Sequence, residues 1–116
     1  MATREEVESF LGRFRIKVEV FQLVFRDDRN KNLETMLELA ISSAERAKTV
    51  KSIEVEDYSE GPIPDCLHHN GDMWVFGKDV KGREVYIKIA LGHPDSSAIC
   101  ISFHLAEHPI KYPFKL

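Results

Sequence analysis

The stretch Val85-Tyr86-Ile87-Lys88-Ile89 decides the fold, because apolar and polar side chains alternate along it without interruption. A second stretch, Ile99-Cys100-Ile101-Ser102-Phe103-His104-Leu105, alternates in a similar way. Alternation of this kind is typical of a β-strand with one face in the core and the other toward solvent. The core face is predicted to hold Val85, Ile87, Ile89, Leu91, Ile99, Ile101, Phe103 and Leu105, and the polar face Tyr86, Lys88, Ser102 and His104.

The two strands are expected to pair with odd-numbered residues beside odd-numbered ones, since a slip of one residue would move isoleucine and phenylalanine into water. Ile89 then lies beside Ile101. The same register places Lys88 near Ser102 and Tyr86 near His104.

A third strand is predicted at Met73-Trp74-Val75-Phe76-Gly77-Lys78. Which of its faces points inward is open. The inward set can be Trp74, Phe76 and Lys78, or it can be Met73, Val75 and Gly77. Lys78 is therefore a less secure member of the polar face than Lys88.

Length and composition suit one folded domain over residues 1–116, since the chain has 116 residues and 43% of them are apolar. The first residues do not show a cationic stretch followed by an apolar signal core, and no apolar run approaches the roughly 20 residues of a membrane helix. The two cysteines, Cys66 and Cys100, do not form a disulfide framework. We expect a soluble cytoplasmic protein that does not enter a membrane.

Charge is distributed unevenly along a chain whose net charge is −3. Residues 1–73 contain 10 Lys or Arg and 15 Asp or Glu, whereas residues 74–116 contain 6 and 4. Proteins that bind long stretches of nucleic acid usually carry a larger basic excess, because phosphate contacts dominate their affinity. The composition therefore permits a local basic site and argues against an extended one.

Helices are predicted in the first half of the chain. Thr3 with Glu6, and Ser42 with Glu45, have the spacing of capping boxes, which start helices. A short edge strand is expected within residues 22–26 between the first two helices. The apolar stripes are Val7, Phe10, Leu11, Phe14, Val18 and Phe21 in the first helix, Leu33, Met36, Leu37, Ala40 and Ile41 in the second, and Ala44, Ala47, Val50 and Ile53 in the third.

Turns connect these helices to the sheet. Residues 57–64 contain Gly61, Pro62 and Pro64, and this composition predicts a crossing loop. Asn70-Gly71 and Lys81-Gly82 are typical of hairpin turns. Together the elements predict an α+β fold, with N-terminal helices packed on one face of a small, twisted antiparallel sheet.

The polar face and the tail contain the types of side chain that cleavage of RNA without a metal ion requires. That reaction needs a base for the ribose 2'-hydroxyl, a proton donor for the leaving oxygen and cations around the phosphorus. Histidine titrates near neutral pH, and lysine stabilises anionic oxygens. The alternative is that these residues are ordinary solvent-side residues of a half-buried sheet. The candidates are Lys78, Tyr86, Lys88, His104, Lys111, Tyr112 and Lys115.

Other chemistries find less support. Cys66, His68, His69 and Asp72 do not have the spacing of zinc ligands, so surface loop residues are expected there. Cys100 and His104 lie about 13 Å apart on one strand, too far for a nucleophile and its base. No glycine-rich phosphate loop or common hydrolase motif is present, and no cofactor is expected.

The tail, Glu107-His108-Pro109-Ile110-Lys111-Tyr112-Pro113-Phe114-Lys115, cannot be a regular strand or helix because of its prolines. We expect an extended segment along the sheet, held by Ile110, Tyr112 and Phe114. It either contributes Lys111, Tyr112 and Lys115 to a functional surface or serves only to close the core.

Four segments, in order and at compatible spacings, resemble the MqsR-type toxins of bacterial type II toxin-antitoxin modules, within the RelE-like superfamily. The resemblance covers residues 53–115 and is weak before them. The segments are Asp57-Tyr58-x-x-Gly61-Pro62, Met73 to Lys78, Val85 to Ile89, and Ile99 to Glu107 together with Tyr112-Pro113-Phe114-Lys115.

The resemblance implies an α+β fold and an endoribonuclease that cuts mRNA. It also implies a cognate antitoxin, in this branch often a small protein with a Cys-rich zinc finger and a helix-turn-helix part. Tyr86 falls on a tyrosine to which the family assigns an active-site role, and Lys88 falls on its neighbouring lysine. The chain departs from MqsR, which has a lysine where Ser59/Glu60 stand and a glutamine in place of Val75.

Because of these departures, His104 and Lys78 enter the predicted site on chemical grounds. The predicted catalytic residues are Lys78, Tyr86, Lys88 and His104, and the predicted substrate-binding residues are Ser102, Lys111, Tyr112 and Lys115, with no metal ligand. The alternative function is a protein-binding module in which the same sheet and tail dock an antitoxin or another partner.

Overall fold

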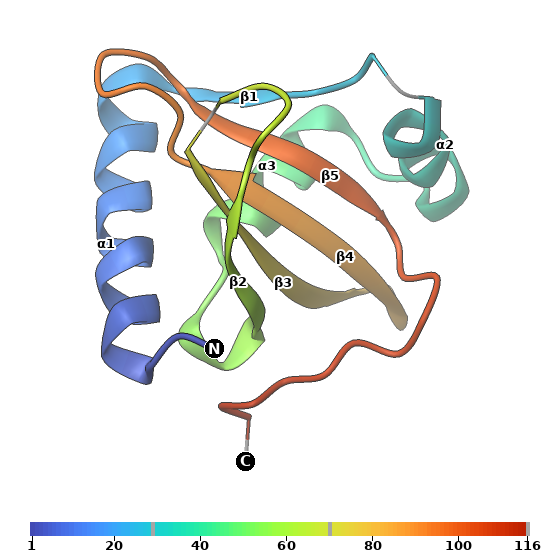
Figure 1. The fold of residues 1–116 in the computed structure, drawn as a ribbon. Helices are drawn as coiled ribbons and strands as arrows, with labels where there is room; N and C mark the ends of the chain where they lie inside the picture. Colours follow the sequence, from blue (N-terminus) through green and yellow to red (C-terminus); the bar gives the residue numbers. More distant parts are fainter. Residues whose placement is uncertain (29, 70, 116) are drawn as a thin grey trace.

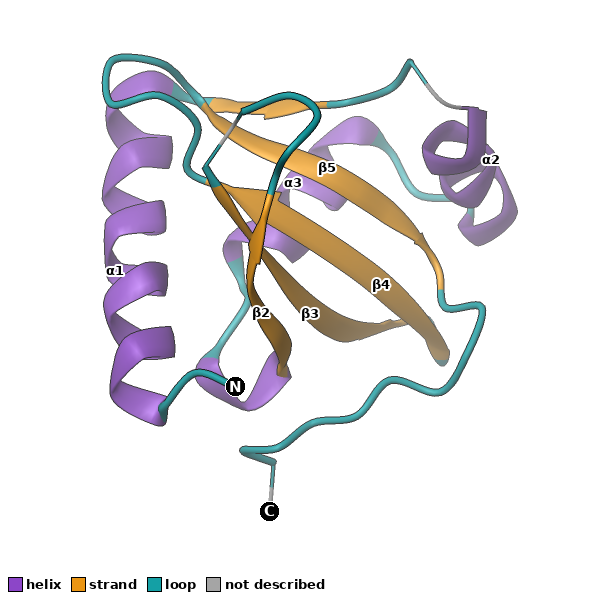
Figure 2. Ribbon diagram, viewed as in Figure 1, coloured by secondary structure: helices purple, strands orange, loops and turns teal. Residues whose placement is uncertain are grey.

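A computed structural model describes residues 1–28, 30–69 and 71–115. In chain order, these residues form the elements shown in Figures 1 and 2: α1 (Arg4–Phe21), β1 (Leu23–Phe25), α2 (Asn30–Leu39), α3 (Ser43–Lys51), a short 3-10 helix η1 (Val55–Asp57), β2 (Tyr58–Pro64), β3 (Asp72–Val80), β4 (Arg83–Ala90) and β5 (Ala98–Leu105).

The strands of the described residues form one five-stranded sheet in the order β1-β5-β4-β3-β2. Neighbouring strands are antiparallel except at one edge, where β1 runs parallel to β5. The helices precede the long strands in the sequence, as the colours of Figure 1 show, so the predicted α+β class is confirmed. The sheet is therefore mixed, and not wholly antiparallel as predicted, because β1 runs parallel to β5.

Both predicted capping boxes form. The Glu6 N–H donates to Thr3 Oγ1 over 3.2 Å, and the Thr3 N–H donates to Glu6 Oε1 over 2.9 Å. Ser42 and Glu45 make the same pair of bonds at the start of α3. These bonds satisfy N–H groups that a helix start leaves without partners, which fixes where each helix begins.

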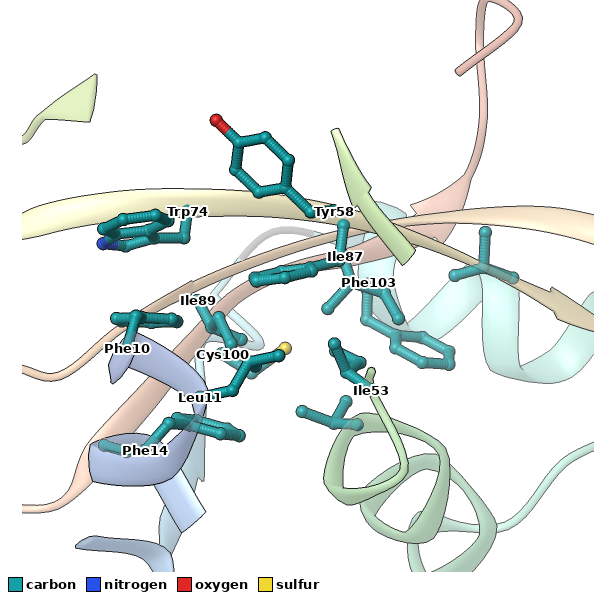
Figure 3. Packing of buried hydrophobic residues seen from close by; sticks show 14 of the residues in the cluster. Phe10, Leu11, Phe14, Ile53, Tyr58, Trp74, Ile87, Ile89, Cys100 and Phe103 are labelled. Atoms are coloured by element: carbon teal, nitrogen blue, oxygen red, sulfur yellow. The ribbon is translucent and has the colours of Figure 1, made fainter. Parts of the chain in front are cut away.

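The core lies between the inner face of the sheet and the helices α1 and α3. Figure 3 shows Phe10, Leu11 and Phe14 of α1 facing the strand side chains, with Ile53 beside them. Phe10 stacks on Trp74 of β3, with 4.6 Å between ring centroids. The predicted stripe of α1 is buried from Val7 to Val18, but Phe21 at its end is 38% exposed.

The second helix packs differently from the prediction. Its buried residues are Asn32, Thr35 and Leu39, whereas Leu37 is 82% exposed. The polar pair faces β5: Asn32 Oδ1 accepts from the Phe103 N–H over 3.1 Å, and Thr35 Oγ1 accepts from the Leu105 N–H over 3.2 Å. The helix thus covers the edge of β5. Of the predicted apolar stripe, Ile41 is buried and Met36 packs against the core, and the stripe as a whole lines a surface hollow.

The segment predicted as a crossing loop, residues 57–64, forms the end of η1 and strand β2 instead. Among the described strands, β2 lies at the edge of the sheet beside β3. It pairs with β3 through two register shifts, so Pro62 and Pro64 are tolerated. Tyr58 at its start is fully buried, donates to the Gly61 carbonyl over 2.6 Å and stacks on Phe114 of the tail. A glycine and two prolines therefore mark an irregular edge strand.

The Lys81-Gly82 turn closes the β3–β4 hairpin as predicted, with positive φ angles of 55° and 81°. The other predicted turn, Asn70-Gly71, includes Asn70, which lies outside the described residues. Among the described residues, every helix is too short or too polar to cross a lipid bilayer.

Candidate active site

The outer face of the sheet brings together the polar residues of β4 and β5. Tyr86 pairs with His104 and Lys88 pairs with Ser102, as the odd-with-odd register predicted. The predicted partner of Ile89 was wrong, because the register shifts by one residue after Lys88 and Ile89 pairs with Cys100. The extra residue, Ile101, forms a bulge.

The bulge reverses the faces of the first half of β5. Ala98 and Cys100 are buried in the core, at 0% and 1% exposure, whereas the predicted core residues Ile99 and Ile101 are partly exposed. Burial raises the pKa of the Cys100 thiol to about 12, so this cysteine is a packing residue.

Tyr86 and His104 stack on each other, with 5.0 Å between ring centroids and 15° between ring planes. His104 Nδ1 lies 2.9 Å from the carbonyl oxygen of Leu105. A carbonyl oxygen only accepts, so Nδ1 carries a proton and donates it to this bond. The bond fixes the ring and leaves Nε2 as the nitrogen that can exchange a proton with a substrate.

The Tyr86 hydroxyl is set up as a hydrogen-bond donor. Burial, together with the negative charge of Glu60, raises the pKa of Tyr86 above its usual value. The phenol therefore stays protonated at neutral pH, where it can donate to an anionic oxygen but cannot act as a base.

A groove of about 590 Å³ lies over this face. It contains five of the eight predicted site residues: Tyr86, Lys88, Ser102, His104 and Lys111. It also contains residues that the sequence did not single out for the site, namely Lys31 from α2, Ser59 and Glu60 from β2, and Glu107, His108, Pro109 and Ile110 from the tail.

Two lysines supply free positive charge to the groove. Lys88 Nζ lies 5.9 Å from the Tyr86 ring centroid, and neither Lys88 nor Lys111 forms an ion pair within the described part of the chain. Lys31 differs, because its Nζ lies 2.5 Å from Glu107 Oε1. This ion pair joins α2 to the tail, and its hydrogen bond lowers the pKa of Glu107.

Lys78 does not join this group. It pairs with Val85, whose side chain is fully buried, so β3 directs Lys78 to the helix side of the sheet together with Trp74 and Phe76. There Lys78 Nζ lies 2.7 Å from Asp57 Oδ2. The assignment of Lys78 to the polar face was wrong, because the register of the β3–β4 hairpin turns Trp74, Phe76 and Lys78 inward.

Tyr112 and Lys115 also lie outside the groove lining. Tyr112 donates its hydroxyl hydrogen to Glu84 Oε2 over 2.7 Å, and Lys115 Nζ lies 4.7 Å from the Tyr112 ring centroid. Burial and the bond to Glu84 raise the pKa of Tyr112, so its proton stays in place. The Tyr112 bond to Glu84 holds the tail, and neither predicted substrate-binding residue lines the groove.

The tail is extended over residues 109–112, as predicted, but it ends in a turn in which the Lys115 N–H donates to the Tyr112 carbonyl over 3.2 Å. The Ile110 N–H donates to Glu84 Oε1 over 3.2 Å. Tyr112 and Ile110 cross the sheet where β3 has Gly77, and a Cβ atom on Gly77 would lie 2.2 Å from Tyr112 Oη. The glycine is needed for this approach, which brings residues 107–111 to the groove as one of its walls.

The loop with Cys66, His68 and His69 lies apart from the groove, and Cys66 is exposed. Within residues 1–28, 30–69 and 71–115, no three His, Cys, Asp or Glu side chains gather as a metal site. Comparisons with protein-family models, curated proteins and solved structures give no match to this chain.

Proposed function

We propose that this chain is a cytoplasmic endoribonuclease that cuts mRNA without a metal ion and acts as the toxin of a type II toxin-antitoxin module. One observation carries the catalytic part of the proposal. The sheet register places Tyr86 and His104, and Lys88 and Ser102, side by side on the wall of one groove, and the tail adds Lys111 to the same groove.

The arrangement suits attack by a ribose 2'-hydroxyl on the neighbouring phosphorus. His104 Nε2 exchanges a proton with the reacting oxygens, because Nδ1 is held by the Leu105 carbonyl. The ammonium groups of Lys88 and Lys111 stabilise the charge that develops on the phosphoryl oxygens. Tyr86 and Ser102 donate hydrogen bonds to the sugar or the phosphate.

The charge of the groove matches a short contact with RNA. Lys88 and Lys111 are free to meet phosphates, whereas Glu107 already neutralises Lys31. The rest of the chain is acidic, with a net charge of −3 overall. Few phosphate contacts predict a weak dependence of binding on salt, with a slope of about −0.7 per neutralised phosphate on a single strand.

The test is cleavage of single-stranded RNA by the purified protein in the presence of EDTA. We expect fragments that end in a 2',3'-cyclic phosphate or a 3'-phosphate. His104→Ala and Lys88→Ala should each lower the rate at least about tenfold, as the loss of acid-base or electrostatic catalysis does.

Two exposed residues outside the groove provide matched controls. His93 lies in the β4–β5 connection and Lys48 lies on α3. His93→Ala and Lys48→Ala should cleave like the wild-type protein. Loss of cleavage in EDTA, or wild-type rates in both groove variants, would contradict the proposed mechanism.

The antitoxin partner rests on the resemblance to MqsR-type toxins. Induced expression should arrest growth, and co-expression of the adjacent reading frame should restore it. A protein-binding module without nuclease activity would leave growth unchanged. That alternative relies on Tyr112 and Phe114 as anchors, yet Tyr112 bonds to Glu84 and Phe114 stacks on Tyr58, so both rings already have partners within the chain.

A further inference from the structure

Glu60 occupies the side of the groove opposite His104. It pairs with Val75 of β3, which pairs with Lys88 of β4, which in turn pairs with Ser102 of β5. Paired residues point to the same face, so Glu60 lies on the outer face in one row with Lys88 and Ser102. Its side chain lines the groove and is exposed there.

The Glu60 carboxylate is available for chemistry. The other carboxylate on the groove wall, Glu107, is bound to Lys31, whereas within the described residues no hydrogen bond or ion pair engages Glu60. It lies close enough to Tyr86 for its negative charge to raise the pKa of that phenol. A free carboxylate in a groove with two free lysines is well placed to accept a proton.

We infer that Glu60 is the general base and His104 the general acid of the proposed ribonuclease, an assignment that rests on that proposed function. In-line displacement needs the base and the acid on opposite sides of the phosphorus. Glu60 on β2 and His104 on β5 are three strand spacings apart, about 14 Å between backbones. Both residues line the groove, and the strand order places Lys88 on β4 between them.

The step is balanced by two proton transfers. Glu60 takes the proton of the 2'-hydroxyl as the bond from the 2'-oxygen to phosphorus forms. The bond from phosphorus to the 5'-oxygen breaks, and His104 Nε2 gives its proton to that oxygen. The products are a 2',3'-cyclic phosphate and a 5'-hydroxyl, and exchange with water restores the carboxylate and the imidazolium.

The two roles are separated by an RNA in which sulfur replaces the leaving 5'-oxygen at one linkage. A thiolate leaves without being protonated, so this substrate needs a base but no acid. Glu60→Gln should lower the rate at least about tenfold on both the oxygen and the sulfur substrate. His104→Ala should also lower the rate at least about tenfold on the oxygen substrate. On the sulfur substrate, the His104→Ala protein should cleave within about threefold of the wild-type rate.

Glu34→Gln on α2 is the matched control, since Glu34 is exposed and does not line the groove. The exposed position of Glu60 on an edge strand lets the amide replace the carboxylate without loss of the fold. If Glu60→Gln cuts both substrates normally, or recovers on the sulfur substrate, the inference is wrong while the proposed function stands. If the wild-type protein cuts neither substrate, both are wrong.

Discussion

The two faces of strand β4 differ in what they contribute. On the inner face, Val85, Ile87 and Ile89 are fully buried among the helices. On the outer face, Tyr86 and Lys88 are only partly buried and line the groove. Under the proposed function, adjacent residues of one strand serve stability and catalysis separately. Substitutions on one face should then leave the other property unchanged.

The largest expected effect comes from the inner face. Ile87→Ala removes a fully buried side chain from the middle of the sheet, and the cavity should lower the free energy of unfolding by about 2–5 kcal/mol. Urea denaturation measures the loss. Ile16→Ala makes the same chemical change at a position that is 64% exposed, and should change stability by less than about 0.5 kcal/mol. If Ile87→Ala and Ile16→Ala lowered the free energy of unfolding equally, the inner face of β4 would not have the stabilising role described here.

The next largest effect distinguishes Lys78 of β3 from Lys88 of β4, which lie on opposite faces of the sheet. Lys78→Ala leaves Asp57, which is 8% exposed, without its ion-pair partner, and should cost about 1–3 kcal/mol of stability. RNA cleavage should be unchanged. Lys88→Ala should lower the rate of RNA cleavage and leave the free energy of unfolding unchanged. In an Asp57→Asn background the stability cost of Lys78→Ala should shrink, and a double-mutant cycle measures that coupling.

The smallest effect concerns the tail. Gly77→Ala places a Cβ atom against Tyr112, so the tail should leave the sheet with a loss of about 1 kcal/mol from its bonds to Glu84. Hydrogen exchange at residues 108–115 should accelerate, and cleavage should fall as Lys111 moves. Gly12→Ala is the control, because its Cβ meets no atom within 4 Å. If exchange in the tail stays slow, Gly77 does not fix its position.

The sequence predicted the regular part of the sheet correctly. Alternation in β4 identified both faces, and the Lys81-Gly82 turn fixed the β3–β4 hairpin. The pairs of Tyr86 with His104 and Lys88 with Ser102 followed from matching apolar faces. These features depend on local pattern and on burial, which the sequence records directly.

The irregular features left no such record. The bulge at Ile101 turns Cys100 inward. Because isoleucines flank Cys100, the sequence predicted an uninterrupted alternation with Ile99 and Ile101 in the core. In β3, neighbouring residues such as Val75 and Phe76 are both apolar, and both are buried. The sequence therefore does not alternate there, and it could not predict to which face Lys78 points. The proline and glycine content of β2 predicted a loop because sequence alone does not reveal that a strand lies at an edge.

The remaining groove residues come from separate parts of the chain. Lys31, Glu60 and Glu107 belong to α2, β2 and the tail, and only the folded chain brings them to one wall. The apolar stripe of the second helix predicted only part of its buried face, since Ile41 is buried and Met36 packs against the core. Asn32 and Thr35 are buried as well, because they bond to the β5 backbone. A helix that bonds to a strand edge does not show the pattern of a helix that packs on a core.

The hydrogen bonds that Asn32 and Thr35 accept from β5 also limit the addition of another strand to the sheet. They occupy N–H groups of β5 beyond its pairing with β1, and β1 itself has three residues. At the opposite edge, two prolines and two register shifts interrupt β2. Short or interrupted edges are poor templates for strand addition and resist aggregation. A protein partner should therefore recognise this molecule through its side chains rather than by extending the sheet.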